Sequence, residues 1–502
     1  MVSSHRSGEQ PGLLPDSMNP PFTERIRTED LGHVHFIGMG GTGMSAVADL
    51  LVSRGLDVSG SDMKHNAALD VLEGKGARVF VPQDAANIEG AQTVVVSTAI
   101  KESNSELAAA RSAGLRVIHR SDALASAMAD SKTIAVAGTH GKTTTSSMIA
   151  VMLDGLGARP SFAVGSTVAA LGTNAALGAT VPESWFVAEA DESDGSFVKY
   201  NPSVAVVTNV EPDHLDFYGS PEAVTAAFDR FVQTMTDDGV LVACEDDAGS
   251  LALAEVQRAE NRPVVTYGTA EGADVRITDI SGEGTRSTAR VDWDFRTAST
   301  ALAGTCDLEL SVPGQHNLRN AAAALCCALI GGFDAADAAR ALTAFTGSAR
   351  RFEFKGERRG VRVYDDYAHH PTEVAAALEA ARTASGGHNV YAVFQPHLFS
   401  RTREFAAEFA EALSLADRAY VVDIFPAREE PIEGVTSRLI TESGHTEVRY
   451  ASSSGEAAGR VASAASEGDI VMTIGAGDVT TFGDKILDEL SEGGPSTARD
   501  ES

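Results

Sequence analysis

Cysteines are few in this sequence and long apolar segments are missing, and each absence excludes a class of protein. The 502 residues include four cysteines, whose spacing fits neither a metal site nor a disulfide framework. No run of about 20 apolar residues is present, which argues against a membrane-spanning helix, and no signal peptide is visible. These absences predict a cytoplasmic protein that is not inserted in a membrane.

Positive charge is also scarce. Lys and Arg number 40 against 70 Asp and Glu, which gives a formal net charge of −30 and a pI near 4.7. A field of this sign repels nucleic acid and anionic membranes, so we expect no nucleic-acid partner. An acidic protein that handles phosphates must therefore gather positive charge locally.

Strand patterns alternate with helical patterns almost to the end of the chain, which predicts α/β units with parallel sheets. The chain is too long for one ordinary core, and its length favours about three domains. The predicted divisions are a flexible leader at 1–28, a first domain at 29–132, a central domain at 133–346, a C-terminal domain at 347–491 and a disordered tail at 492–502.

The most informative segment runs from Thr133 to Thr145. An apolar strand pattern gives way there to a glycine-rich turn, then to Lys142 and three threonines at the start of a helix pattern. Such a segment binds nucleotide phosphates, because backbone N–H groups and the helix dipole face the anion. Lys142 adds a charge, and the Thr143 hydroxyl suits a magnesium ion. The usual P-loop spacing needs glycine where this chain has Val136, so the loop is compressed, and a purely structural turn is the alternative.

A second glycine-rich turn, Gly38-x-Gly40-x-x-Gly43, follows a strand pattern near the start of the chain. Asp62 comes about 20 residues later, a context that is typical of a dinucleotide-binding fold. The pattern favours a phosphate-bearing nucleotide at a helix N-terminus, with NAD among the options. The alternative is that the glycines serve only tight packing of the strand against the helix.

Carboxylates follow two apolar strand patterns of the central domain. Glu189-Ala-Asp-Glu-Ser-Asp194 follows one, and Asn209-Val-Glu-Pro-Asp-His-Leu-Asp216 follows the other. Acidic oxygens beside a phosphate loop are ligands that Mg²⁺ prefers. Two such clusters favour two ions, which would neutralise the repulsion between ATP and a carboxylate substrate. His214 is either a metal ligand or a polar loop residue.

Polar residues also begin one helix pattern and end several strand patterns further on. His316-Asn-Leu-Arg-Asn320 opens a helix, where the side chains either contact a base and ribose or cap the helix. In the C-terminal domain, polar segments follow the strands, where ligands bind in open α/β sheets. Their Arg, His and Asp residues suit an amino-acid zwitterion. These segments are 365–371, 395–401, 423–429 and 475–478, and 350–353 lies in the linker before them.

Taken together and in this order, the motifs make the chain resemble the Mur ligases over residues 31–490. The compressed phosphate loop is the usual form in that family. The resemblance implies an α/β fold of three domains: a Rossmann-like N-terminal domain, a central P-loop ATPase domain with a mostly parallel sheet, and a C-terminal Rossmann-like α/β domain. It also implies an ATP-dependent ligase of peptidoglycan precursor synthesis that uses Mg²⁺ and is a monomer or homodimer. The motifs are most similar to those of the member that acts on UDP-N-acetylmuramate and L-alanine.

The resemblance further implies roles for individual residues. The catalytic group would comprise Lys142, Glu189, His214, Arg350 and Arg351, with one of the two arginines on the γ-phosphate. ATP would contact Gly138, Thr139, His140, Gly141, Lys142, Thr143, Thr144, His316, Asn317 and Asn320. The UDP-sugar would contact Gly38, Gly40, Gly41, Thr42, Gly43 and Asp62. The amino acid would contact His370, His397, Arg401 and Arg403. The ligands of Mg²⁺ would be Thr143 and Glu189 for one ion, and Glu189 and His214 for the second.

The implied chemistry is activation of the lactyl carboxylate as an acyl phosphate, which the amine of L-alanine then attacks. Three alternatives stay open. One is a sibling ligase that recycles a muropeptide tripeptide or adds a later stem residue. Another is an NAD-dependent oxidoreductase, favoured only by the first glycine turn. The third is a nucleotide-binding switch protein without ligase activity.

Overall fold

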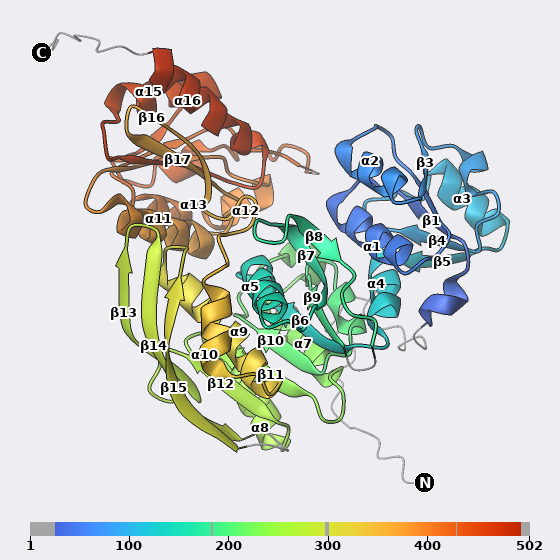
Figure 1. Cartoon of the computed structure of the whole chain (residues 1–502). Helices are drawn as coiled ribbons and strands as arrows, with labels where there is room; N and C mark the ends of the chain where they lie inside the picture. Colours follow the sequence, from blue (N-terminus) through green and yellow to red (C-terminus); the bar gives the residue numbers. More distant parts are fainter. Residues whose placement is uncertain (1–25, 182–183, 297–300, 428, 493–502) are drawn as a thin grey trace, which may run out of the picture. The chain divides into compact units, whose positions relative to one another are not determined.

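The computed structural model describes residues 26–181, 184–296, 301–427 and 429–492. Nearly all of the predicted leader and tail lies outside these ranges. The chain divides into two compact units. Figure 1 colours the ribbon by residue number, so each segment can be found by its position in the sequence. The first unit comprises the residues up to 278 together with 290–307 and 319–344, and the second comprises 279–289, 308–318 and the residues from 345 onward.

The first unit begins with five strands that form one parallel sheet. The elements are β1 (Val34–Ile37), α1 (Thr42–Ser53), β2 (Val58–Ser61), α2 (Ala67–Gly74), β3 (Arg78–Phe80), β4 (Thr93–Val96), α3 (Ser105–Ser112), β5 (Arg116–His119) and α4 (Arg120–Met128). The strand order is β3-β2-β1-β4-β5. Val34 and Phe36 share a core with α1, α2 and α4, whereas Ile37 packs with α3 on the opposite face. Helices therefore cover both faces, as is usual for a parallel sheet.

A second sheet begins in the first unit, and its last three strands along the chain run into segments of the second. Its strands are β6 (Lys132–Ala137), β7 (Ser161–Val168), β8 (Thr173–Ala176), β9 (Trp185–Glu189), β10 (Val204–Val207), β11 (Val240–Cys244), β12 (Val264–Gly268), β13 (Val275–Glu283), β14 (Arg286–Arg296) and β15 (Ala301–Leu310). They are ordered β15-β14-β13-β12-β11-β10-β6-β9-β7-β8. Because β10, β6 and β9 are parallel neighbours, their carboxyl ends meet at one edge of the sheet.

In the part of the chain that the structure describes, six helices accompany this sheet. They are α5 (Lys142–Gly155), α6 (Leu215–Tyr218), α7 (Pro221–Gln233), α8 (Ala248–Ala259), α9 (Gln315–Ile330) and α10 (Ala335–Leu342). The amphipathic α7 begins with Ser220 as its N-cap and Pro221 in its first turn. Its Phe231 stacks on Phe197, with ring centroids 5.0 Å apart. Helix α5 contacts β6, β7 and β9, so the helix that starts at the phosphate loop packs on the strand that ends in Glu189.

The second unit has a six-stranded sheet of its own. Its strands are β16 (Glu353–Arg358), β17 (Val361–Asp366), β18 (Val390–Phe394), β19 (Arg418–Val421), β20 (Val448–Tyr450) and β21 (Ile470–Ile474). Its helices are α11 (Pro371–Ser385), α12 (Phe399–Glu404), α13 (Ala406–Leu413), α14 (Arg438–Thr441), α15 (Ser454–Ala464) and α16 (Phe482–Glu492). The strand order is β16-β17-β21-β18-β19-β20, and the pair β16–β17 is antiparallel. Helices α11 and α13 share one core with the sheet, and α15 and α16 share another.

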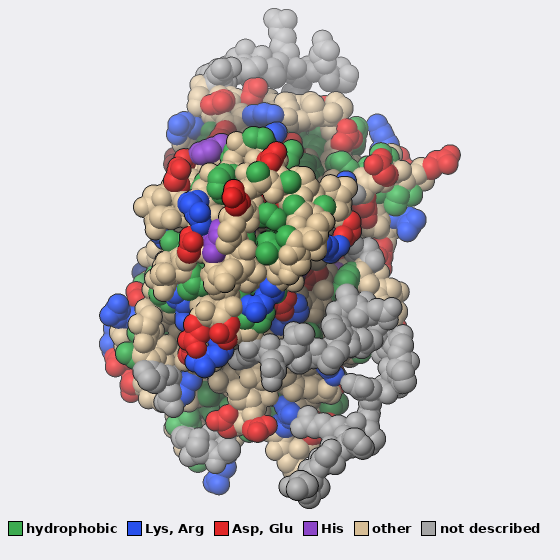
Figure 2. Space-filling view, turned by 90° about the vertical axis from the view of Figure 1, so that its right-hand side faces the viewer, with side chains coloured by type: hydrophobic (Ala, Val, Ile, Leu, Met, Phe, Trp, Pro, Cys, Tyr) green, Lys and Arg blue, Asp and Glu red, His purple; other side chains and the backbone are tan. Residues whose placement is uncertain are grey.

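Among the described residues, no helix is both long and apolar enough to cross a membrane. On the face drawn in Figure 2, basic side chains are scattered among acidic ones rather than gathered in one patch. Since the whole chain carries a net charge of −30, a bound phosphate would depend on individual cations placed at its site.

Candidate active site

The predicted phosphate loop follows β6 and ends where α5 begins, at Lys142. Gly138 and Gly141 adopt φ angles of +138° and +82°, which favour glycine. A Cβ at Gly138 would lie 1.9 Å from Thr208 Oγ1, and one at Gly141 would lie 3.1 Å from Asn320 Oδ1. The two glycines thus permit a tight turn whose backbone an anion can approach.

The end of β10 holds this loop in place. His140 N donates to Asn209 Oδ1 at 2.8 Å, and Asn209 Nδ2 donates back to His140 O at 3.2 Å. Glu211 N donates to Thr139 Oγ1 at 2.9 Å, and the Thr208 hydroxyl donates to the His140 carbonyl. No role for Asn209 was predicted from the sequence, although its position directly after an apolar strand was a usable signal.

Lys142 is enclosed by acceptors. Its ammonium donates to the carbonyl oxygens of Gly138 at 2.6 Å and Thr139 at 3.0 Å. It also pairs with Glu192, whose carboxylate oxygens lie 3.0 and 2.8 Å from Nζ. The Glu192 side chain is 2% exposed. The sequence places Glu192 in the acidic segment after β9, but it does not show which of the acids there turns toward the loop.

Glu189, the last residue of β9, faces the first turn of α5. Thr143 Oγ1 donates to Glu189 Oε1 at 2.9 Å, and the Gly165 N–H donates to Oε2. A Cβ at Gly165 would lie 2.8 Å from both carboxylate oxygens, so a larger residue there would displace the Glu189 carboxylate from this position. The structure therefore brings Thr143 and Glu189 together, a hydroxyl and a carboxylate of the kind that hold Mg²⁺.

His214 immediately precedes α6 and has a left-handed φ of +53°. Its Nε2 lies 3.7 Å from Glu192 Oε1 and 3.7 Å from Asp213 Oδ2. The sequence-based interpretation pairs His214 with Glu189 on a second ion. The structure places the carboxylate of Glu192 beside both His214 and Lys142, while Glu189 contacts Thr143.

Burial and neighbouring charges shift the pKa values of Lys142 and of the acidic side chains around it. Burial raises the pKa of the Glu189 and Glu192 carboxyls, and Lys142 only partly offsets that effect. Burial also opposes ionisation of Asp191, but Lys142 and the Ser193 N–H lower its pKa. For Lys142, burial disfavours the ammonium, yet Glu192 and Asp191 raise its pKa overall. One ammonium thus faces several acids. This donor set, beside the glycine turn, fits nucleotide phosphates together with Mg²⁺.

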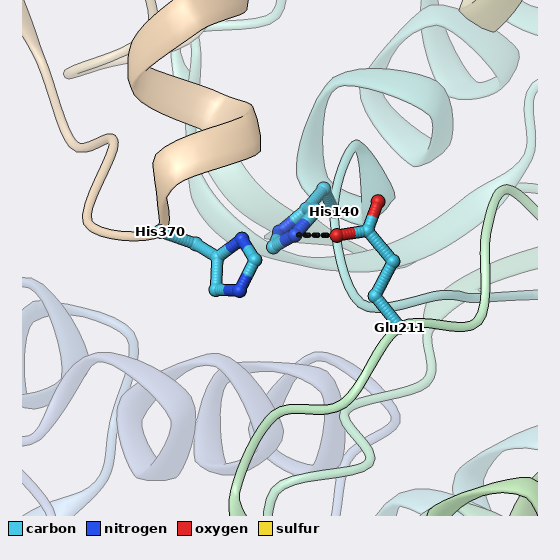
Figure 3. Close-up of side chains that lie close together, drawn as sticks. All are labelled: His140, Glu211 and His370. Atoms are coloured by element: carbon cyan, nitrogen blue, oxygen red, sulfur yellow. Dashed lines mark ion pairs between the residues drawn. The ribbon is translucent and has the colours of Figure 1, made fainter. Parts of the chain in front are cut away.

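The side chain of His140 points away from its loop toward the segment after β10. Its Nε2 lies 3.5 Å from Glu211 Oε2, as the dashed line in Figure 3 marks. This pair adds a side-chain contact to the backbone bonds that fasten the loop. His370, which Figure 3 also labels, belongs to the second unit and is described with it.

The start of α9 carries the residues predicted to contact the base and ribose. Asn320 is buried and its Oδ1 lies beside Gly141 of the phosphate loop. The Asn317 amide donates to Pro313 O at 2.7 Å, which fixes the chain just before the helix. The His316 ring lies against Gly314. Asn320 belongs to the first unit and lies at the phosphate loop, whereas His316 and Asn317 belong to the second unit.

The first glycine turn, between β1 and α1, is fastened by the end of β2. The N–H groups of Gly38 and Met39 both donate to Ser61 O at 2.8 Å. Gly40 N donates to Asp62 Oδ2 at 2.9 Å. The predicted residue Asp62 therefore lies at the turn itself.

Gly41 is the N-cap of α1, and Thr42 and Gly43 form its first turn. Asn174 Nδ2 donates to Thr42 O at 3.4 Å. A Cβ at Gly43 would lie 2.2 Å from Nη1 of Arg120, the first residue of α4. Arg120 brings a cation to this turn from a helix far along the chain, and the sequence alone did not indicate it.

The two linker arginines have different surroundings within the second unit. Arg350 Nε donates to the buried Asp365 at 3.1 Å, and its Nη2 donates to Gly475 O at 2.6 Å. Arg351 Nη1 instead donates to Glu373 Oε1 at 3.3 Å. The guanidinium of Arg350 thus fixes the ends of β17 and β21 to each other.

The residues predicted to contact the amino acid lie at the carboxyl edge of the second unit's sheet. His370 is buried at the N-cap position of α11. His397 follows β18, and its ring stacks on Phe425 with centroids 6.0 Å apart. Arg401 of α12 is 6% exposed, whereas Arg403 of the same helix is exposed. The side chain of Arg403 is thus open to solvent, whereas those of His370 and Arg401 are buried.

Family models match three successive parts of the chain. The model of the Mur ligase family catalytic domain matches residues 33–132, that of the Mur ligase middle domain matches 136–328, and that of the Mur ligase glutamate ligase domain matches 350–477. The chain belongs to the Mur ligase family. The predicted three-domain α/β fold is thereby confirmed.

Within the family, the chain is similar to several ligases of one name. The UDP-N-acetylmuramate–L-alanine ligase of Paenarthrobacter aurescens strain TC1 is 56% identical over 463 residues, which are 92% of this chain and 98% of that protein. The same-named ligase of Renibacterium salmoninarum is 54% identical over 466 residues, 93% of this chain and 97% of that protein. The crystal structure of the UDP-N-acetylmuramate–alanine ligase of Thermotoga maritima is similar at a TM-score of 0.73 and 27% identity, covering 91% of this chain and 99% of that chain.

Proposed function

We propose that this chain is an ATP-dependent, amide-bond-forming ligase that joins L-alanine to the lactyl carboxylate of UDP-N-acetylmuramate in cytoplasmic peptidoglycan precursor synthesis. One observation carries the proposal. A phosphate loop with Lys142 meets an oxygen-donor pair, Thr143 and Glu189, at one sheet edge of a chain 56% identical to a ligase of that name. We expect a monomer or homodimer.

The residues of this edge suit the chemistry. A carboxylate is a poor electrophile, so the lactyl carboxylate attacks the γ-phosphate of ATP, which gives an acyl phosphate and ADP. The amine of L-alanine attacks the acyl carbon, and the tetrahedral intermediate collapses to the amide and inorganic phosphate. Lys142 stabilises the charge on the transferred phosphate. Mg²⁺ would be held by Thr143 and Glu189, with His214 serving a second ion, and would act as a Lewis acid.

The other predicted residues receive their roles from the same proposal. Residues 38–43 with Asp62 bind the UDP portion of the sugar nucleotide, and residues 138–144 with the start of α9 bind ATP. His370, His397 and Arg401 serve L-alanine, and the exposed Arg403 is the weakest candidate. Of the linker arginines, Arg351 is the better candidate for the γ-phosphate, because the Arg350 guanidinium holds both Asp365 and the Gly475 carbonyl, whereas Arg351 has a longer bond to Glu373.

The test is phosphate release from ATP and Mg²⁺ with UDP-N-acetylmuramate, screened across L-alanine, glycine, L-serine, D-glutamate and a stem tripeptide. We expect release that needs both the sugar nucleotide and L-alanine, with a product heavier by one alanyl residue. Release with the tripeptide alone would favour a second candidate, a murein peptide ligase. The structure of one from Psychrobacter arcticus is similar at a TM-score of 0.65 and 25% identity. No release with any of these substrates would contradict both.

A further inference from the structure

The ammonium of Lys142 has no donor left for a phosphate. A lysine side chain has three N–H donors, and the structure gives it three partners, namely the Gly138 carbonyl at 2.6 Å, the Thr139 carbonyl at 3.0 Å and the Glu192 carboxylate at 3.0 Å. A phosphate that binds Lys142 must therefore displace one of these partners.

Glu192 is the partner that conflicts with a phosphate. The two carbonyls are neutral and belong to a loop that Asn209 and Thr208 fasten through His140. Glu192 is buried and its carboxylate oxygens lie within 3.0 Å of Nζ. Two anions on one ammonium repel each other strongly where water is excluded. Glu192 must therefore move away from Lys142 or gain another cation when phosphate arrives.

The main chain at Glu192 is fixed, so only its side chain is able to turn. Its carbonyl oxygen accepts the Tyr218 hydroxyl and the Gly195 N–H, the latter at 2.9 Å. The side chain already has a second neighbour, because Glu192 Oε1 lies 3.7 Å from His214 Nε2. A divalent cation beside His214 is thus within reach of this carboxylate without any shift of the backbone.

We propose that Glu192 exchanges partners when nucleotide binds. In the nucleotide-free protein its carboxylate pairs with Lys142, and in the complex it moves to a divalent cation beside His214, which leaves the ammonium to the phosphates. Glu192 is then a positioning residue that couples cation binding to nucleotide binding. This inference rests on the ATP site of the proposed function.

The experiment measures the affinity of the full-length protein for ATP by calorimetry, once with Mg²⁺ and once with a chelator. Sugar nucleotide and amino acid are omitted, so that no ligation occurs. We expect Mg²⁺ to strengthen binding to the wild type. Glu192→Gln should bind ATP more tightly than wild type without Mg²⁺ and gain less from Mg²⁺, so that the ratio of the two Kd values falls by about tenfold or more.

The matched control is Asp194→Asn, which removes the same charge from the same segment. Asp194 Oδ1 accepts the Ser196 N–H at 3.0 Å, and Oδ2 lies 3.7 Å from His119 Nε2. We expect this variant to keep the wild-type ratio of Kd values. An unchanged ratio in Glu192→Gln, or an equal loss of affinity in both conditions, would overturn the proposal.

A third variant keeps the test decisive if Glu192→Gln fails to fold, which thermal unfolding would reveal. Glu192→Asp retains the charge on a shorter side chain, so we expect wild-type affinity without Mg²⁺ and a smaller gain with it. A full gain in this variant would overturn the proposal. Because these measurements need no ligation, a wild type that binds ATP but forms no amide would contradict the proposed function and leave the result for Glu192 interpretable.

Discussion

The first two sheets of this protein carry the same strand, glycine turn and helix start, but with different side chains around the turn. In each, a buried parallel strand ends in a glycine turn that leads into a helix, β1 into α1 and β6 into α5. Each turn starts with a glycine of positive φ, +80° at Gly38 and +138° at Gly138. Each is fastened by the end of a neighbouring strand, through Asp62 in one case and Asn209 in the other. The backbone therefore offers a similar anion site twice.

The two turns differ in the side chains that neighbouring segments bring to them. At the first turn the carboxylate of Asp62 bonds a backbone N–H, and Arg120 lies near Gly43. At the second, Lys142 pairs with Glu192, and Thr143 bonds Glu189. Under the proposed function, the first turn would hold the diphosphate of the sugar nucleotide, and the second would use its cation and oxygen donors for phosphoryl transfer.

The largest expected effect comes from removing the cation of the second turn. Lys142→Met leaves that turn with its glycines and acids alone, so we expect turnover to fall by at least about 10³-fold, as when a key electrostatic donor is lost. Lys132→Met is the control, since Lys132 is exposed at the other end of β6, and it should keep near-wild-type turnover. Turnover of Lys142→Met within tenfold of wild type would contradict the assignment.

A second change weakens the proposed oxygen-donor pair. Glu189→Gln keeps an acceptor for Thr143 and loses the charge, so we expect turnover to fall by about 10²-fold and the Mg²⁺ requirement to rise. A titration of activity against Mg²⁺ measures both. Glu260→Gln, at the exposed end of α8, should leave the titration unchanged. An unaltered Mg²⁺ requirement in Glu189→Gln would remove this residue from the metal site.

The glycine turns and the fold were predictable because their signals are local. Strand, turn and helix start follow one another within about 15 residues at Lys142, and the motif order identified three α/β domains. The partners of the turns were not predictable, because they arrive through strand register. Parallel pairing places Glu189 opposite Val136, and Val207 opposite Ala137. No spacing in the sequence shows that Glu192 rather than Asp191 pairs with Lys142.

Sequence-based prediction also failed to separate two adjacent residues of the second unit. The sequence could not choose between Arg350 and Arg351, because the two arginines share one motif. The structure separates them through the backbone, since Arg350 has a left-handed φ of +58° and its side chain reaches Asp365 and Gly475. Such a choice depends on a main-chain conformation that residue type alone does not predict.

Alanine substitutions in the two turns should differ in their effect on stability. Gly138→Ala places a Cβ 1.9 Å from Thr208 Oγ1 at a φ of +138°, so we expect a loss of about 1–3 kcal/mol. Gly41→Ala has an ordinary φ of −69° and a nearest atom at 3.6 Å, so the loss should be only that of replacing a glycine N-cap, below about 1 kcal/mol. Unfolding in denaturant measures both, and equal losses would refute the contrast.

The smallest expected effect tests whether the two turns serve different substrates. Asp62→Asn keeps the acceptor for Gly40 N and removes the charge, so we expect the KM for UDP-N-acetylmuramate to rise by about fivefold, the scale of one weakened hydrogen bond. The KM for ATP should not change. Asp57→Asn, which alters an exposed pair with Arg78 in the same sheet, is the control and should leave both constants at their wild-type values.

Comparing the two KM values of Asp62→Asn, one for UDP-N-acetylmuramate and one for ATP, shows what Asp62 does more clearly than the size of either change. A carboxylate that only braces the turn would, once replaced by an amide that still accepts from Gly40 N, leave both constants unaltered. A carboxylate that contacts the sugar nucleotide raises the constant for that substrate alone. A rise in the KM for ATP instead would mean that the first turn serves the nucleoside triphosphate, and the division of labour between the two turns would then have to be reversed.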